Sequence, residues 1–296
     1  MPSLIDIRRR IRSVRNTQQI TKAMKMVAAA RLRKAQDRVI SARPYNKMLG
    51  EILQNVAAAA ALDERAASHP LLAARPEEKI QLVLFTADRG FAGAFNANLI
   101  KAAVQFCADN EGPNQQGPNQ PGKVDLELRG KKGRDFFRRR PAYAVSGEAV
   151  GISEAPTYAQ ARELSATLIE RFSSGVIDSV YILYNEFKSV LSQRVTLTKV
   201  LPMTLPAGQA ARDYLYEQPP AELMQVLLPR YVELNLYRAM LESAAAEHAA
   251  RMTAMDAATT NAAEVIDKLT LYMNRVRQAS ITKEIIEVVS GAAALE

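Results

Sequence analysis

The chain has 296 residues, 48% of them hydrophobic and 24% charged, with a formal net charge of +8. These values are ordinary for a globular protein of one large or two modest domains, and the basic balance indicates an acidic partner, nucleic acid or an anionic surface. One cysteine, Cys107, and two histidines far apart in the sequence argue against a disulfide or a zinc site, and no apolar run has the length or flanks of a membrane span or a secretory signal.

The first predicted element is a helix over residues 3–62. Ser3 fits an N-cap, with Asp6 three residues later as its capping partner. An apolar stripe typical of a helix in a coiled coil follows, with a phase change near Thr17. Its members are Leu4, Ile7, Ile11, Val14, Ile20, Met24 and Val27. Pro44 predicts a kink or a break in the later part of this helix.

The same helix is strongly basic. From Arg8 to Lys47 it carries thirteen Lys or Arg residues and one acid, Asp37. A basic helix can serve nucleic acid, but aromatic side chains for stacking on bases are absent there, since Tyr45 is the first. We therefore favour a solvated basic face that meets an acidic protein partner, and we expect no nucleic acid.

The middle of the chain predicts an α/β domain over residues 76–212. Short apolar or alternating runs predict strands over 79–86, 124–129 and 179–186, with one or two more in 190–203. Amphipathic patterns predict helices over 94–109 and 157–172. This alternation is typical of a Rossmann-like domain with a mainly parallel sheet. A flexible insert over 110–123, in which Gly-Pro-Asn-Gln occurs twice, and an exposed basic run over 131–140 interrupt it.

The turn after the first predicted strand, Asp88 to Gly93, raises an alternative. Such a turn can cradle a phosphate where the next helix begins. No complete phosphate-binding glycine motif of the G-x-x-x-x-G-K-[ST] or G-x-G-x-x-G type is present. The alternative interpretation is a nucleotide-binding α/β switch protein with a coiled-coil arm for a partner.

The C-terminal segment, residues 219–290, has the most regular pattern. A short helix is predicted before Pro229, and no Pro or Gly follows as far as Ser290. Between Leu227 and Lys283, seventeen positions can be chosen that lie alternately four and three residues apart, a four-three step. Twelve of these positions are apolar, which predicts a coiled coil. Because a single apolar stripe does not stay exposed, the terminal helices are predicted to pair, antiparallel, into a shaft.

The end of this helix has too many apolar residues for one seam. Ile285, Ile286, Val288 and Val289 lie on more than one face of the helix. A helix that is apolar around much of its girth indicates a partner that surrounds it.

Residues at both ends and in the centre resemble the gamma subunits of bacterial F-type ATP synthases. The C-terminal match rests on Ile281, Thr282, Glu284, Glu287, Gly291 and Ala292. Further similar segments are Thr21–Ala29, Arg43–Tyr45, Asp88–Gly90, Phe95–Asn96 and Asn274–Ser280. There are departures: Lys25 stands where many relatives carry an acid, and Asp256 stands where Lys is common.

The resemblance implies a non-catalytic subunit without cofactor or metal. It implies one copy per complex, acting as the central shaft inside a ring of three alpha and three beta subunits. The α/β domain is expected to rest on the c ring and to bind epsilon, with which the shaft regulates the ATPase. Proton flow would turn the c ring, and the shaft would couple that rotation to ATP synthesis or hydrolysis. The chain is expected on the cytoplasmic side of the cell inner membrane, as a peripheral protein held there through the complex.

The resemblance also implies which residues contact the beta subunits. By motif position these are Arg277, Gln278, Thr282 and Glu284 on the C-terminal helix, with Lys22, Met24 and Lys25 on the facing N-terminal helix.

Overall fold

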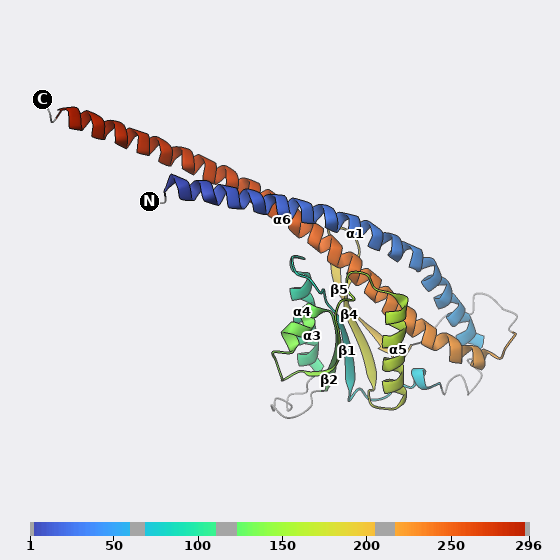
Figure 1. Ribbon diagram of the computed structural model, residues 1–296. Coiled ribbons are helices and arrows are strands. Elements are labelled where there is room, and N and C mark those ends of the chain that lie inside the picture. Colours follow the sequence, from blue (N-terminus) through green and yellow to red (C-terminus); the bar gives the residue numbers. More distant parts are fainter. Residues whose placement is uncertain (1–2, 60–68, 111–122, 205–216, 294–296) are drawn as a thin grey trace. The chain divides into compact units, whose positions relative to one another are not determined.

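The computed structural model describes residues 3–59, 69–110, 123–204 and 217–293. The chain divides into two compact units. The helical unit consists of residues 1–29 and 251–296, of which 3–29 and 251–293 are described, and the sheet unit consists of residues 30–250. Two long helices, α1 (Leu4–Ala59) and α6 (Pro220–Ala293), contribute to both units (Figure 1). The predicted insert falls on residues 111–122, which lie outside the described ranges.

The sheet unit is built on five strands in the order β3-β2-β1-β4-β5. They are β1 (Ile80–Phe85), β2 (Val124–Arg129), β3 (Ala144–Ala149), β4 (Ser179–Phe187) and β5 (Gln193–Leu201). The first four are parallel and β5 is antiparallel to β4, which confirms the predicted mainly parallel sheet. The central strand β1 is buried along its whole length because both of its faces are covered, and all of its residues except Gln81 are hydrophobic.

Helices cover both faces of this sheet. They are α3 (Phe95–Asn110), α4 (Lys131–Phe137) and α5 (Tyr158–Ser173), with a short 3₁₀ turn, η1 (Pro70–Leu72). One core joins Val83 and Phe85 of β1 to α5, to the end of α1 and to the start of α6. The other joins Leu82 and Leu84 to α3 and α4. The side chains of β1 therefore alternate between two cores, as the period of a strand requires.

Several predicted elements need correction. The segment 190–203 forms one strand, β5, which is one of the two outcomes predicted, whereas β3 was not predicted at all. Helix α1 continues through Pro44 and α6 continues through Pro229, so the predicted break and the separate short helix are wrong. Tertiary packing offsets the cost of an internal proline, about 3 kcal/mol, because Leu53 on α1 and Leu228 on α6 are both buried in the same core.

The seam of the helical unit runs without the predicted phase change. Ile20 and Val27 are exposed, at 60% and 53%, so their assignment to the seam is wrong. Thr21 and Ala28 are buried instead. The covered positions follow one four-three step through Leu4, Ile7, Ile11, Val14, Gln18, Thr21, Lys25 and Ala28. On α6 the predicted seam is confirmed from Met255 to Ser280, where every position at the same step is buried or partly covered, whereas Arg238 and Lys283, also predicted for the seam, are exposed.

Candidate functional site on the paired terminal helices

Two side-chain contacts join α1 to α6 in the helical unit. Thr21 Oγ1 lies 2.8 Å from Thr259 Oγ1, and Lys25 Nζ lies 2.6 Å from Asp256 Oδ1. As the residue number rises on α1 it falls on α6, so the helices are antiparallel, as predicted. Each threonine hydroxyl also lies close to a carbonyl oxygen of its own helix, at 3.0 Å for Gln18 and 2.7 Å for Met255. Both threonine hydroxyls at this polar position of the seam therefore have hydrogen-bond partners.

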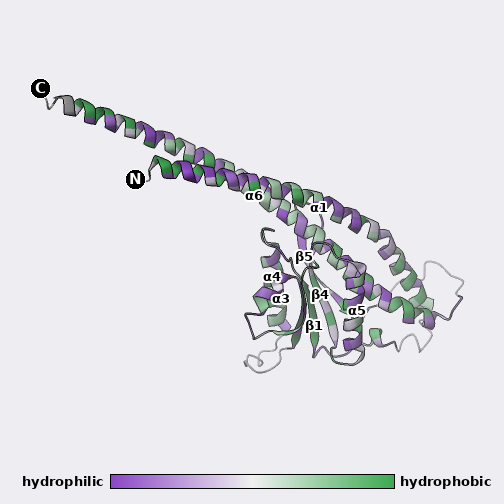
Figure 2. Cartoon of the chain, viewed as in Figure 1, coloured by the Kyte–Doolittle hydropathy of each residue, from purple (hydrophilic) through white to green (hydrophobic). Residues whose placement is uncertain are grey.

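The C-terminal end of α6 extends beyond α1. In an antiparallel pair of helices, opposed residues have numbers with a constant sum, and the two contacts give sums of 280 and 281. Leu4, the first residue of α1, therefore lies opposite roughly residue 276 of α6. All of the residues 281–290 are exposed, and Val288 and Val289 are 73% and 61% accessible. Figure 1 shows this end of α6 running past the N-terminus of α1, and Figure 2 shows that hydrophobic residues continue into its last turns.

The residues predicted to contact a partner lie in two separate places. Arg277, Gln278, Thr282 and Glu284 are exposed on the unpaired end of α6. Lys22 is exposed on α1, while Met24 and Lys25 are partly covered, and this group lies opposite the region of α6 near Thr259. About 20 helical residues, or ~30 Å, separate that region from Gln278. The structure therefore does not bring the two groups together, although both lie on the paired terminal helices, and their contact with beta subunits stays a prediction.

The signature residues form few contacts within the chain. Glu284 accepts a hydrogen bond from Ser280 Oγ at 3.1 Å, and Glu287 forms an exposed ion pair with Lys283 at 3.4 Å. Ile281 and Thr282 are exposed, and Gly291 and Ala292 belong to the end of α6. Local pairs of this kind support a helix by only a few tenths of a kcal/mol, so packing within the chain does not account for this set of side chains.

A basic collar occupies the first turns of α1. Its members, all exposed, are Arg8, Arg9, Arg10, Arg12 and Arg15. Within the described part of the chain none of the five forms an ion pair. The sequence predicted this surface correctly as an exposed basic face.

Asp88, the first residue of the turn that suggested a phosphate site, is itself an acceptor for backbone N–H groups. Asp88 accepts hydrogen bonds from the backbone N–H groups of Lys131, at 3.0 Å, and Ser153, at 3.1 Å. Burial opposes ionisation of Asp88, but backbone N–H donors from Gly151, Ser153 and Lys131 outweigh it and lower the pKa. Asp88 thus binds the first N–H of α4 and joins the end of β1 to neighbouring segments, which is a structural role for this residue.

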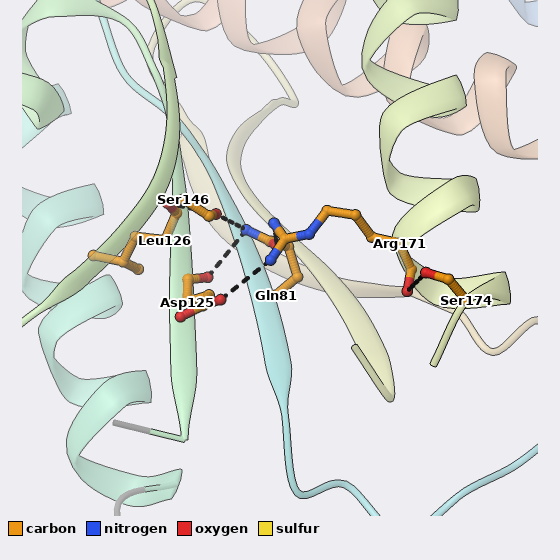
Figure 3. Close-up of polar contacts among 6 residues, drawn as sticks. All are labelled: Gln81, Asp125, Leu126, Ser146, Arg171 and Ser174. Carbon is orange, nitrogen blue, oxygen red and sulfur yellow. Dashed lines mark hydrogen bonds and ion pairs between the residues drawn. The ribbon is translucent and has the colours of Figure 1, made fainter. Parts of the chain in front are cut away.

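A second polar cluster, at the amino ends of β1 and β2, is also structural. The Arg171 guanidinium donates to Gln81 Oε1 and to Asp125 Oδ2, the latter at 3.2 Å, while Gln81 Nε2 donates to Ser146 Oγ at 2.7 Å (Figure 3). Gln81 is fully buried, so these bonds satisfy a polar side chain inside the core. Gln81 and Asp125 are second residues of their strands, whereas α/β domains bind ligands at the carboxyl ends.

Two further classes of site are absent from the described ranges. No three side chains among His, Cys, Asp and Glu gather there as metal ligands would. No described helix is both long enough and apolar enough to cross a membrane.

Comparisons with known proteins agree with the paired-helix architecture. A family model described as ATP synthase matches residues 3–295. The ATP synthase gamma chain of Solibacter usitatus is 62% identical over 296 residues, with all of both chains covered, and that of Pelotomaculum thermopropionicum is 48% identical over 299 residues, again with full coverage.

Solved structures share the fold. A chain of the Euglena gracilis mitochondrial ATP synthase, in a structure of its OSCP/F1/c-ring part, superposes with a TM-score of 0.69 at 19% identity, covering 99% of this chain and 94% of that one. A chain of the Tetrahymena thermophila mitochondrial ATP synthase, in a structure of the central stalk and c ring, gives a TM-score of 0.56 at 21% identity, covering 81% and 99%. From the family model and from relatives that match over their whole length, the chain belongs to the ATP synthase gamma chain family.

Proposed function

We propose that this chain turns as the shaft at the centre of a ring of three alpha and three beta subunits, and that its C-terminal tip contacts the beta subunits. Membership of the family makes the chain a non-catalytic subunit of ATP synthase, in the central rotor. The finer proposal rests above all on the unpaired end of α6, where apolar and signature residues are exposed together.

The exposed apolar tip supports a surrounding partner. Ile285, Ile286, Val288 and Val289 are each more than half exposed. Full burial of one such side chain contributes roughly 1.5–3 kcal/mol, so a ring that closes around the tip gains several kcal/mol. Because α6 continues here without α1, the tip is a single helix and presents a different face to each subunit around it.

Such asymmetry is the physical basis of coupling. Three chemically identical beta subunits that meet different faces of one helix have different contact energies. A difference of about 5.5 kcal/mol is enough to move a two-state subunit from 1:99 to 99:1. Rotation then carries each subunit through its conformations in turn. The basic collar supports an acidic partner, which we propose to be loops of the beta subunits.

The remaining partners follow from the same proposal. The sheet unit rests on the c ring and binds epsilon, and one copy of the chain serves each complex. Its place is the cytoplasmic side of the cell inner membrane, where the complex holds it as a peripheral protein and proton flow drives its rotation. Epsilon-dependent regulation of the ATPase acts through this unit.

A reconstituted complex tests the tip contact. We expect Arg277→Ala with Gln278→Ala to lower both ATP synthesis and ATP hydrolysis roughly tenfold, which corresponds to about 1.4 kcal/mol. Thr260→Ala with Asn261→Ala is the matched control, because these two residues are also exposed polar positions on α6. Unchanged rates in the Arg277 and Gln278 double variant, with normal assembly, would remove the tip contact from the proposal.

A further inference from the structure

Two residues that line one pocket of the sheet unit each carry a buried oxygen that lacks a hydrogen-bond donor. The pocket has a volume of about 760 Å³ and is lined by residues of α1, of α6 and of the end of β4. Asn46 on α1 and Glu242 on α6 both contribute to its wall. Asn46 Oδ1 and Glu242 Oε2 are closed off from solvent and accept no hydrogen bond. The pocket is large enough for a side chain or a small ligand.

The Glu242 carboxylate is only half satisfied. Its Oε1 accepts a hydrogen bond from Arg238 Nε at 2.8 Å, and the residue is 4% exposed. Tyr184 lies near it: burial first, and the charge of Glu242 second, raise the pKa of Tyr184 to about 12, so the phenol stays neutral. A buried carboxylate oxygen without a donor loses its hydration without a hydrogen bond in return. Any group that donates a hydrogen bond to Oε2 therefore stabilises the site.

The chemistry of the pocket defines that group. Both unpartnered atoms are acceptors and one of them is charged, so the complementary group is a cationic donor. Ile40, Tyr231 and Leu234 line the same pocket and suit an aliphatic stem. An arginine side chain has such a stem and five N–H donors in a rigid plane. We propose that this pocket receives an arginine side chain from a partner polypeptide.

The rim of the pocket restricts which arginine enters. Arg43, Lys47 and Lys188 also line it, and all three are exposed. Lys188 pairs with Glu186 at 2.7 Å, whereas Arg43 forms no ion pair within the described chain. These cations repel a free cationic ligand. An arginine flanked by acidic residues overcomes that repulsion, because its neighbours pair with the rim.

Entry requires one movement. Arg238 also lines the pocket, and its side chain is about half exposed and is held by the bond to Glu242 Oε1. The incoming guanidinium reaches Oε2 when Arg238 shifts toward solvent. The shift breaks the bond from Arg238 to Oε1, but the planar fork of the incoming guanidinium can donate to both carboxylate oxygens in exchange.

A titration of the full chain tests the proposal. The probes are three acetylated, amidated tripeptides, Asp-Arg-Asp, Asp-Gln-Asp and Lys-Arg-Lys. The readout is the chemical shift of the Ile40 and Leu234 methyl groups. We expect saturable shifts with Asp-Arg-Asp and at least tenfold weaker affinity for the other two. Equal affinity for Asp-Gln-Asp, or no saturable shift with any probe, would overturn the proposal.

Two isosteric variants separate the pocket from its rim. Glu242→Gln keeps an oxygen for Arg238 and replaces the acceptor charge, so we expect at least a tenfold loss of affinity for Asp-Arg-Asp. Glu186→Gln removes another carboxylate of the same pocket, one already paired with Lys188, and we expect a change of less than threefold. Undiminished binding by a folded Glu242→Gln chain, checked by circular dichroism, contradicts the proposal. None of these results depends on the rotor role.

Discussion

Lys25 Nζ lies 2.6 Å from Asp256 Oδ1, in an ion pair that joins the two antiparallel helices while leaving both side chains about half exposed. The resemblance to gamma subunits marked both residues as departures, an acid replaced by Lys25 and a lysine replaced by Asp256. The contact places the two residues together, so the departures that the resemblance implies still leave opposite charges facing each other across the helices.

This relationship predicts the outcome of a charge-exchange experiment. Lys25→Glu places two carboxylates together, and we expect it to lower the free energy of unfolding by about 0.5–1 kcal/mol, the range of an exposed pair. Adding Asp256→Lys restores the attraction and should recover most of the loss. Urea denaturation of the single variants and the double variant gives the coupling energy. A coupling of zero would mean that the ion pair contributes nothing to the seam.

The buried seam predicts a difference between two alanines of α1. Ala28 is 2% exposed in the seam, whereas Ala23 is exposed. Ala28→Leu forces extra volume between the helices, and we expect it to cost about 1–3 kcal/mol of unfolding free energy. Ala23→Leu should change the same quantity by less than about 0.5 kcal/mol. Equal thermal melts of the two variants would contradict the phase of the seam.

Asp88 predicts a pH-dependent contribution to stability. Its folded-state pKa is lowered, so its stabilisation is present above the ordinary pKa of 3.8 and is lost as the pH falls through the lowered value. Asp88→Asn leaves one acceptor for several N–H donors, and we expect a loss of about 1–3 kcal/mol at pH 7. The difference in unfolding free energy between Asp88→Asn and the unsubstituted chain should become smaller below about pH 4.

Asp37→Asn is the control for this measurement, because Asp37 is an exposed acid of the same unit. Denaturation of all three chains between pH 3 and pH 7 makes the comparison. A gap for Asp88→Asn that persists unchanged at pH 3 would mean that the negative charge is not what holds the turn.

Alanine substitutions at two glycines are expected to change the stability of the chain in opposite directions. A Cβ at Gly147 would lie 2.1 Å from Glu127 Oε2, and Glu127 forms a 2.8 Å ion pair with Arg129. Gly147→Ala should therefore displace that carboxylate, the far end of a flexible side chain, and cost about 0.5–3 kcal/mol through the weakened ion pair. Gly50 lies in α1 with no neighbour within 4 Å of its Cβ position, so Gly50→Ala should stabilise the chain by about 0.5–1 kcal/mol. Thermal unfolding of both variants checks the two signs.

Much of the fold follows from sequence because its signals are strong. The buried run of β1 and the four-three step of α6 depend on local pattern alone, and both were predicted. Strand β3 was missed because it is an edge strand with a weak apolar pattern, and its conformation depends on pairing with β2. The local pattern of apolar residues does not predict that β3 pairs with β2.

The site was harder to predict than the fold. Polar residues at seam positions, Gln18 and Thr21, hid the true phase of α1, while the apolar but exposed Ile20 suggested another. Thr21 meets Thr259 across 238 residues of sequence, and only the register of the paired helices reveals such a contact. The signature residues near the C-terminus were located correctly on a helix, but how far α6 extends past α1 depends on that same register.

Rotation of the chain inside its complex tests the central claim most directly. A probe attached through Lys101→Cys, an exposed position on α3, reports the orientation of the sheet unit, while Cys107 is buried and does not react. With the alpha and beta ring fixed to a surface and ATP supplied, single-molecule imaging should show the probe turning in steps in one direction. A probe that stays still in complexes that are hydrolysing ATP would contradict the rotor account.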